Sequence, residues 1–268
     1  ECISVLTPAG PTTEAYFWNI RLPLMGPAPF VKSIPGTPLD NLVVFPALSF
    51  DSGKRPQTIR IVGRRWNSPQ EQEVLLELSP DQWMPPLKTT WAMSHAGYVT
   101  TNPNGKSLCV VLNESSLTNN YLAEFDLSSV EAQLSPKRLT SGGKRIVPWT
   151  VRYSPTGSQL LYMREAEREG RELWVFAFAR DRLNGSPVAV GVVGDDAAFS
   201  QDETLLTINV AREHDMPEIR LISAVNGAVV GHLGNGLIGP SPWHPSGRYL
   251  VVTDKGRVWA VESEYPYR

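Results

Sequence analysis

One histidine of this chain lies between acidic residues, in the segment Arg212-Glu213-His214-Asp215. Imidazole and carboxylate groups bind divalent metals and transfer protons in catalysis. The spacing matches neither His-x-His nor His-Glu-x-x-His, which are typical of metal sites. We therefore expect no metal and no other cofactor, and we interpret Arg212 and His214 as solvated loop residues that contact a binding partner.

Tryptophan and basic residues supply the other candidate contacts. Trp83 and Trp91 lie in the long segment 79–94, which also contains the pair Pro85-Pro86. Long loops in compact domains are commonly functional, and aromatic side chains are enriched at protein interfaces. The alternative is that both tryptophans fold back as a plug over a central channel. Basic residues of other expected loops complete the predicted contact set, namely Lys144, Arg145 and Arg164.

Signatures of nucleophilic and phosphate chemistry are absent from the sequence. There is no Gly-x-Ser-x-Gly segment, the pattern that presents a serine nucleophile. There is also no Gly-rich phosphate loop between an expected strand and a helix. Carboxylates are the remaining catalytic candidates, and Asp195 and Asp196 are the acids expected nearest to His214. Two or three acids converging on one site would favour a carbohydrate-active hydrolase or lyase.

A short turn phrase recurs along the chain and indicates the elements that carry these residues. Each copy runs from an apolar or β-prone residue, through a small polar residue or His, into a turn and then an apolar run. Successive copies are 52, 46 and 44 residues apart, counted between Pro103, Pro155, Gln201 and Pro245. A weaker copy, Pro38-Leu39-Asp40, lies earlier. Self-similarity at this period means that one supersecondary unit is used repeatedly.

Each unit contains four expected strands, A to D, and the turn phrase joins strand A to strand B. Short apolar runs bounded by Gly, Pro, Asn and Asp predict strands. Examples are strand B at 160–163, strand C at 172–178 and strand D at 137–140. Four strands in about 45 residues predict the blade of a β-propeller. The expected fold is therefore all-β, a propeller of four-stranded antiparallel blades, with residues 1–268 as a single domain.

Three of these segments resemble the repeat of TolB-type, WD-repeat-like β-propellers. They are Ser154-Pro155-Thr156-Gly157, the following Gln159-Leu160-Leu161-Tyr162, and Glu172-Leu173-Trp174-Val175. The resemblance covers roughly residues 95–262, but no Asp follows Trp174 or Trp259 as it would in true WD repeats. It implies the propeller architecture and favours a periplasmic or extracellular location with any signal peptide already removed.

The number of blades and the way the ring closes are open in the sequence. The spacing of the turn phrases favours five blades, with Ile3 to Thr7 supplying the missing strand D of the last one. Closing the ring in this way would remove exposed sheet edges. The alternative is six blades, with Cys2 to Leu6 as a strand B, Tyr16 to Leu22 as a strand C, and further residues preceding Glu1.

The propeller fold would gather the candidate residues on one face, because the D-to-A and B-to-C loops emerge there together. The D-to-A loops are expected to bring Lys144 and Arg145, together with Asp195 and Asp196. The B-to-C loops are expected to bring Arg164, Arg212 and His214 to the same face. Loops on a rigid scaffold are where binding residues concentrate.

The charge, the lengths of the apolar runs and the cysteine content exclude several classes of binding partner and structural framework. The formal net charge is −2 and the basic residues are dispersed, so we expect no nucleic-acid binding. No apolar run reaches the roughly 18 residues of a membrane span. The two cysteines, Cys2 and Cys109, do not suggest a disulfide framework, and Cys109 in an apolar strand predicts an inert core thiol.

We interpret the chain as a non-catalytic propeller that binds another protein or protein complex as a scaffold subunit. The alternative is a carbohydrate-active enzyme, or a carbohydrate-binding surface, at the channel mouth. A third interpretation is the propeller portion of a larger peptidase. Function inferred from fold alone is an analogy, so the residues of the functional site are needed to distinguish these three interpretations.

Overall fold

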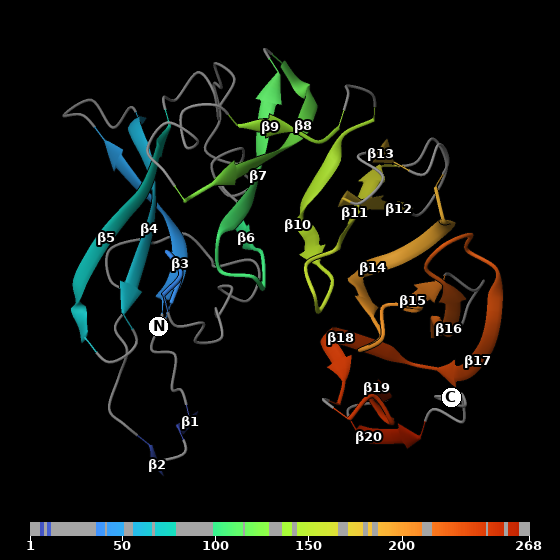
Figure 1. Ribbon diagram of the computed structural model, residues 1–268. Coiled ribbons are helices and arrows are strands. Elements are labelled where there is room, and N and C mark those ends of the chain that lie inside the picture. Colours follow the sequence, from blue (N-terminus) through green and yellow to red (C-terminus); the bar gives the residue numbers. More distant parts are fainter. Residues whose placement is uncertain are drawn as a thin grey trace.

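Figure 1 shows the computed structural model of the 268-residue chain. The structure describes residues 6–7, 10–11, 36–40, 42–50, 56–65, 68–78, 99–114, 116–128, 136–140, 144–165, 171–178, 182–183, 187–210, 216–244, 246–254 and 257–262. Within these ranges every regular element is a β-strand apart from an isolated helical turn residue, Phe178. The predicted all-β class is therefore confirmed.

The strands form successive antiparallel units in chain order. The first unit contains β3 (Leu42–Phe50), β4 (Pro56–Arg65) and β5 (Ser68–Leu78). The second contains β6 (Val99–Thr101), β7 (Ser107–Glu114), β8 (Ser116–Asp126) and β9 (Lys137–Arg138). The third contains β10 (Ile146–Tyr153), β11 (Gln159–Glu165), β12 (Arg171–Ala177) and β13 (Arg182–Leu183).

A long strand links the third unit to the fourth. It is β14 (Ala189–Phe199), and the fourth unit continues with β15 (Leu205–Val210), β16 (Glu218–Ser223) and β17 (Val229–Asn235). The last unit contains β18 (Leu237–Trp243), β19 (Tyr249–Asp254) and β20 (Arg257–Glu262). Figure 1 shows the units following one another along an arc, as blades of a propeller do.

The apolar core consists of layers between consecutive blades. Along β11, Leu160 and Tyr162 pack toward the second unit, against Cys109 and Leu122. Leu161 and Met163, one residue out of phase, pack into the layer shared with the fourth unit. Alternation of side chains along a strand explains this division, because neighbouring residues point to opposite faces of the sheet. The nearly unbroken apolar run of strand B therefore serves two interfaces at once.

The recurrent phrase forms the same turn in every described copy. The backbone N–H of Gly105 donates to Asn102 O, and the corresponding bonds join Gly157 to Ser154, Glu203 to Ser200 and Gly247 to His244. The last residue of each turn has a positive φ, +72° at Gly105, +78° at Gly157, +61° at Glu203 and +71° at Gly247. Glycine suits this left-handed conformation. The predicted equivalence of the turns is thus confirmed, although Pro245 itself lies outside the described residues.

Neighbouring turns also contact one another. Asn102 Nδ2 donates to the carbonyl of Gly157 at 3.4 Å. Glu203 accepts the N–H of Thr156 and the hydroxyl of Ser158, both at 2.5 Å. The one non-glycine residue among these left-handed positions therefore uses its carboxylate to hold the preceding blade.

Two buried asparagines join consecutive blades at the opposite end of the strands. Asn120 bonds both the N–H and the carbonyl of Ile146, at 2.7 and 2.8 Å. Asn209 accepts the N–H of Ile238 and donates to the carbonyl of Gly236. Each amide therefore satisfies buried backbone groups in the first residues of the next blade.

One sequence prediction about the connections was wrong, and another is not tested. Asp195 and Asp196 were expected in a D-to-A loop, but they lie inside β14, which pairs with β12 near Ala189 and with β15 near Phe199. The strand turns from one blade to the next through a register shift instead of a loop. In the N-terminal region, β1 (Leu6–Thr7) pairs with β2 (Gly10–Pro11), and closure of the ring by Ile3 to Thr7 stays a prediction. The expected closing residues before Leu6 lie outside the described residues.

Candidate functional site

Three of the predicted contact residues meet at one end of the third blade. Strands β10, β11 and β12 lie side by side, with Ile146 opposite Arg164 and Arg164 opposite Glu172. Lys144 and Arg145 immediately precede β10, and the backbone N–H of Glu165 donates to Arg145 O. This end is opposite the Ser154–Gly157 turn. We call Lys144, Arg145, Arg164, Glu165, Glu172 and Trp174 the basic–aromatic cluster.

Arg164 is the buried centre of the cluster. Its guanidinium carbon lies 5.0 Å from the Trp174 ring centroid and 5.5 Å from that of Tyr162. Burial raises the pKa of the Tyr162 phenol, although the neighbouring Arg164 acts in the opposite direction. Cation–π contact fixes the planar guanidinium against two rings that are themselves packed in the core. The expectation that Arg164 lies in a B-to-C loop is therefore wrong, because it lies near the end of strand β11 and is buried.

Glu172 organises the surface of the cluster. One carboxylate oxygen accepts from Lys144 Nζ at 2.6 Å, and the other accepts from Trp174 Nε1 at 3.3 Å. Arg145 reaches Glu165 at 3.5 Å. Exposed ion pairs of this kind contribute little to stability, about 0–1 kcal/mol each. Their effect is to hold two cationic side chains and an indole edge in fixed positions at the rim of the blade.

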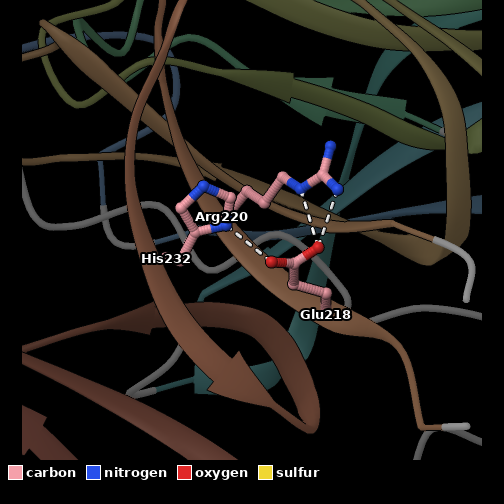
Figure 2. A network of polar contacts seen from close by, with 3 residues as sticks. All are labelled: Glu218, Arg220 and His232. Carbon is pink, nitrogen blue, oxygen red and sulfur yellow. Dashed lines mark hydrogen bonds and ion pairs between the residues drawn. The ribbon is translucent and has the colours of Figure 1, made fainter.

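A second polar network lies in the fourth blade (Figure 2). Glu218 is buried at the start of β16, and it accepts two bonds from Arg220, at 2.9 and 2.7 Å. Its other oxygen lies 2.5 Å from Nδ1 of His232 on β17. Two hydrogen-bonding partners satisfy the buried carboxylate. His232 is therefore hydrogen-bonded from within a strand.

The remaining predicted contact residues cannot be placed in this site. Trp83, Trp91, Arg212 and His214 lie outside the described residues. Among the residues that are described, no group of three His, Cys, Asp or Glu side chains could hold a metal ion. Within the same ranges, no helix has the length and hydropathy needed to cross a membrane.

Sequence reasoning missed the two acids that organise these networks. Glu172 and Glu218 occupy equivalent positions in strand C, each directly before a buried aliphatic residue, Leu173 or Ile219. Each bonds the side chain two residues further on, Trp174 or Arg220. The recurrence of a glutamate at this position in two successive repeats was the signal that could have identified both.

Comparison with solved structures shows the same fold in several proteins of different activity. TolB from Acinetobacter baumannii superposes with a TM-score of 0.50 at 16% identity, covering 82% of this chain and 48% of that one. An oligogalacturonate lyase in complex with manganese gives 0.53 at 12% identity, with 78% and 55% covered. Prolyl oligopeptidase B from Galerina marginata gives 0.52 at 12% identity, with 85% and 31% covered.

These similarities confirm the β-propeller class, and at such low identity they show the fold alone. The chain spans about half the length of the first two proteins. No family model matches the sequence, and no curated protein matches it. TolB-like architecture is thereby supported, while the choice between a binding protein and an enzyme depends on the site.

Proposed function

We propose that this propeller is a non-catalytic, protein-binding scaffold whose contact surface includes the basic–aromatic cluster. One observation carries the proposal: the partly exposed Lys144, Arg145 and Trp174 are held together at one blade end, with the buried Arg164 stacked behind Trp174. Arginine and tryptophan are among the residues most enriched in the hot spots of protein interfaces. A rigid scaffold that presents Arg145 and Trp174 loses little conformational entropy when a partner binds.

The chemistry of the cluster supports binding more than turnover. Glu172 accepts from both Lys144 and Trp174, so its carboxylate is committed to holding those side chains. Arg145 and Lys144 remain partly exposed, with 36% and 35% of their side-chain surface accessible. Such side chains can exchange an internal ion pair for one with a partner at small cost, because exposed pairs are weak.

A quantitative pull-down tests this proposal. The immobilised 268-residue chain, its Lys144→Glu/Arg145→Glu variant and an Arg60→Glu control would each be incubated with the same source extract. Arg60 suits the control because it is exposed and pairs with Glu77 at 2.7 Å on a different blade. The proposal predicts proteins retained by the wild type and the control but depleted at least about tenfold by the double variant. Equal retention by all three chains would refute it.

A carbohydrate-active enzyme is the second candidate function. It is favoured by the Glu218–His232 contact, because a carboxylate bonded to Nδ1 orients Nε2 of a histidine as a base. The fold similarity to an oligogalacturonate lyase makes acidic oligosaccharides the first substrates to test. Ultraviolet detection of unsaturated product, formed by the wild type and lost in His232→Ala, would support this candidate over the scaffold.

A further inference from the structure

Equivalent positions of the repeat meet in each layer between consecutive blades. One position is the aromatic residue that directly precedes a turn, which is Tyr153, Phe199 or Trp243 in successive layers. The other lies on strand B of the preceding blade, seven residues after the start of that blade's turn, and is Cys109, Leu161 or Thr207. The layers can therefore be compared residue by residue, because each pair occupies the same place in the repeat.

In two of these layers the aromatic residue has the partners that its chemistry requires. Between the second and third blades, the hydroxyl of Tyr153 donates to Glu124 Oε1 at 3.1 Å. Burial raises the pKa of the Tyr153 phenol, so the phenol keeps its proton and can donate. Between the third and fourth blades, Leu161 and Phe199 have no polar side-chain atom, and both lie in the apolar layer.

The layer between the fourth and last blades differs, because it contains two buried polar atoms without a partner. Thr207 is fully buried and Trp243 is 7% exposed. Within the described part of the chain, neither Thr207 Oγ1 nor Trp243 Nε1 has a hydrogen-bond partner. Leu221 lies opposite Thr207 on strand C, at the position of Glu124, so strand C supplies no acceptor here. Buried polar groups are normally paired with protein or with ordered water, because leaving them unpaired costs free energy.

The side chains of Thr207 and Trp243 face the same layer. The ladder partners of Thr207 are Ala198 on β14 and Leu221 on β16, and residues directly opposite one another share a face of the sheet. Both partners belong to the same apolar cluster as Trp243. Strand β15, which contains Thr207, also lies against β18, which ends at Trp243.

We propose that this layer contains a binding site for one water molecule, which bridges Thr207 Oγ1 and Trp243 Nε1. The indole N–H can only donate, so the bridging group must accept, whereas the threonine hydroxyl can donate or accept. Water meets both requirements and is small enough for a closely packed interior. An apolar molecule would leave both atoms unpaired, and an ion would lack an opposite charge, because both side chains are neutral.

The variant Thr207→Val distinguishes a bridged hydroxyl from an unpaired one by the sign of its effect on stability. Valine has nearly the same shape but no hydroxyl. Breaking a water bridge leaves the indole N–H unpaired, so we expect the folding equilibrium constant to fall about tenfold in urea titration. A variant as stable as the wild type, or more stable, would overturn the proposal. Thr140→Val calibrates the loss, because Thr140 is buried and its hydroxyl accepts from the N–H of Leu122 at 2.9 Å.

Nuclear magnetic resonance tests for the water itself, because a direct bond between Thr207 and Trp243 would also make the valine variant less stable. The indole N–H signal of Trp243 is identified by its loss in Trp243→Phe. We expect a dipolar cross-peak between this proton and a bound water, and its loss in Thr207→Val. No cross-peak in the wild type, or one that is unchanged in Thr207→Val, would overturn the proposal. The site lies between other blades than the basic–aromatic cluster, so the result does not depend on the proposed function.

Discussion

Glu203 provides a direct test of how the turns hold neighbouring blades together. It adopts φ +61° where the equivalent turns have glycine, and its carboxylate accepts from Thr156 and Ser158 of the preceding blade. The left-handed conformation costs about 1 kcal/mol for a residue with a Cβ. Two partly exposed hydrogen bonds to the carboxylate should offset it with about 1–2 kcal/mol in total.

These two effects predict an order of stability for three proteins. Glu203→Ala loses the hydrogen bonds and keeps the backbone cost, so it should be destabilised by about 1–2 kcal/mol. Glu203→Gly loses the same bonds but relieves the backbone, so it should be about 1 kcal/mol more stable than the alanine variant. Thermal unfolding should resolve the series, since 1 kcal/mol shifts the Tm of a chain this size by roughly 2–4 °C.

The same contact predicts a pH dependence. Partial burial acts to raise the pKa of Glu203, but hydrogen bonds from Ser158 and Thr156 outweigh it and leave the pKa below its usual value. The unfolded chain therefore binds the proton more readily than the folded chain. The stabilisation is present above the ordinary carboxyl pKa and is lost as the pH falls through the folded one.

The difference in Tm between wild type and Glu203→Ala should accordingly be full at neutral pH and shrink below about pH 4. Glu203→Gln is the matched control, because it keeps an acceptor oxygen but cannot titrate. An alanine variant at least as stable as the glycine variant would refute the backbone argument. A glycine variant more stable than wild type would refute the role of the carboxylate bonds.

Three further perturbations test the fold. Asn209→Ala should lower the free energy of unfolding by roughly 2–4 kcal/mol in urea titration, because it leaves buried backbone groups at Gly236 and Ile238 unpaired. Gly157→Ala should lower the Tm, because φ is +78° and its Cβ would lie 2.1 Å from Asn102 Oδ1; an unchanged Tm would contradict the turn geometry. Burial raises the pKa of the Cys109 thiol, so it should react with a thiol reagent only as fast as the protein unfolds, and rapid labelling under native conditions would contradict its place in the core.

The fold was predictable because its signal is periodic. Turn residues and apolar runs recur at almost constant spacing. Each reflects a local requirement of the fold, because Gly157 adopts a left-handed conformation and strand β11 is buried on both faces. The connections were less predictable. Asp195-Asp196 has the polarity of a loop, but it lies within β14, at the register shift between Val192 and Ala197 where this strand passes from one blade to the next.

The candidate site was predictable only in part. Lys144, Arg145 and Arg164 could be assigned to one face from the order of the strands. The burial of Arg164 could not, because it depends on the rings of Tyr162 and Trp174, which lie on adjacent strands. The charged residues at 164–171 predict a solvent-exposed loop. Arg164, the first of them, is instead buried by its cation–π contacts and by packing against β12.

Site-specific photocrosslinking tests the central claim most directly. A photoreactive amino acid would replace Arg145 in the basic–aromatic cluster, and Arg60 in a matched control chain, before irradiation in the source extract. The protein-binding account predicts a discrete crosslinked partner from position 145 that is absent from position 60. No crosslinked product from position 145, or the same products from both positions, would contradict the claim that this blade end is a binding surface.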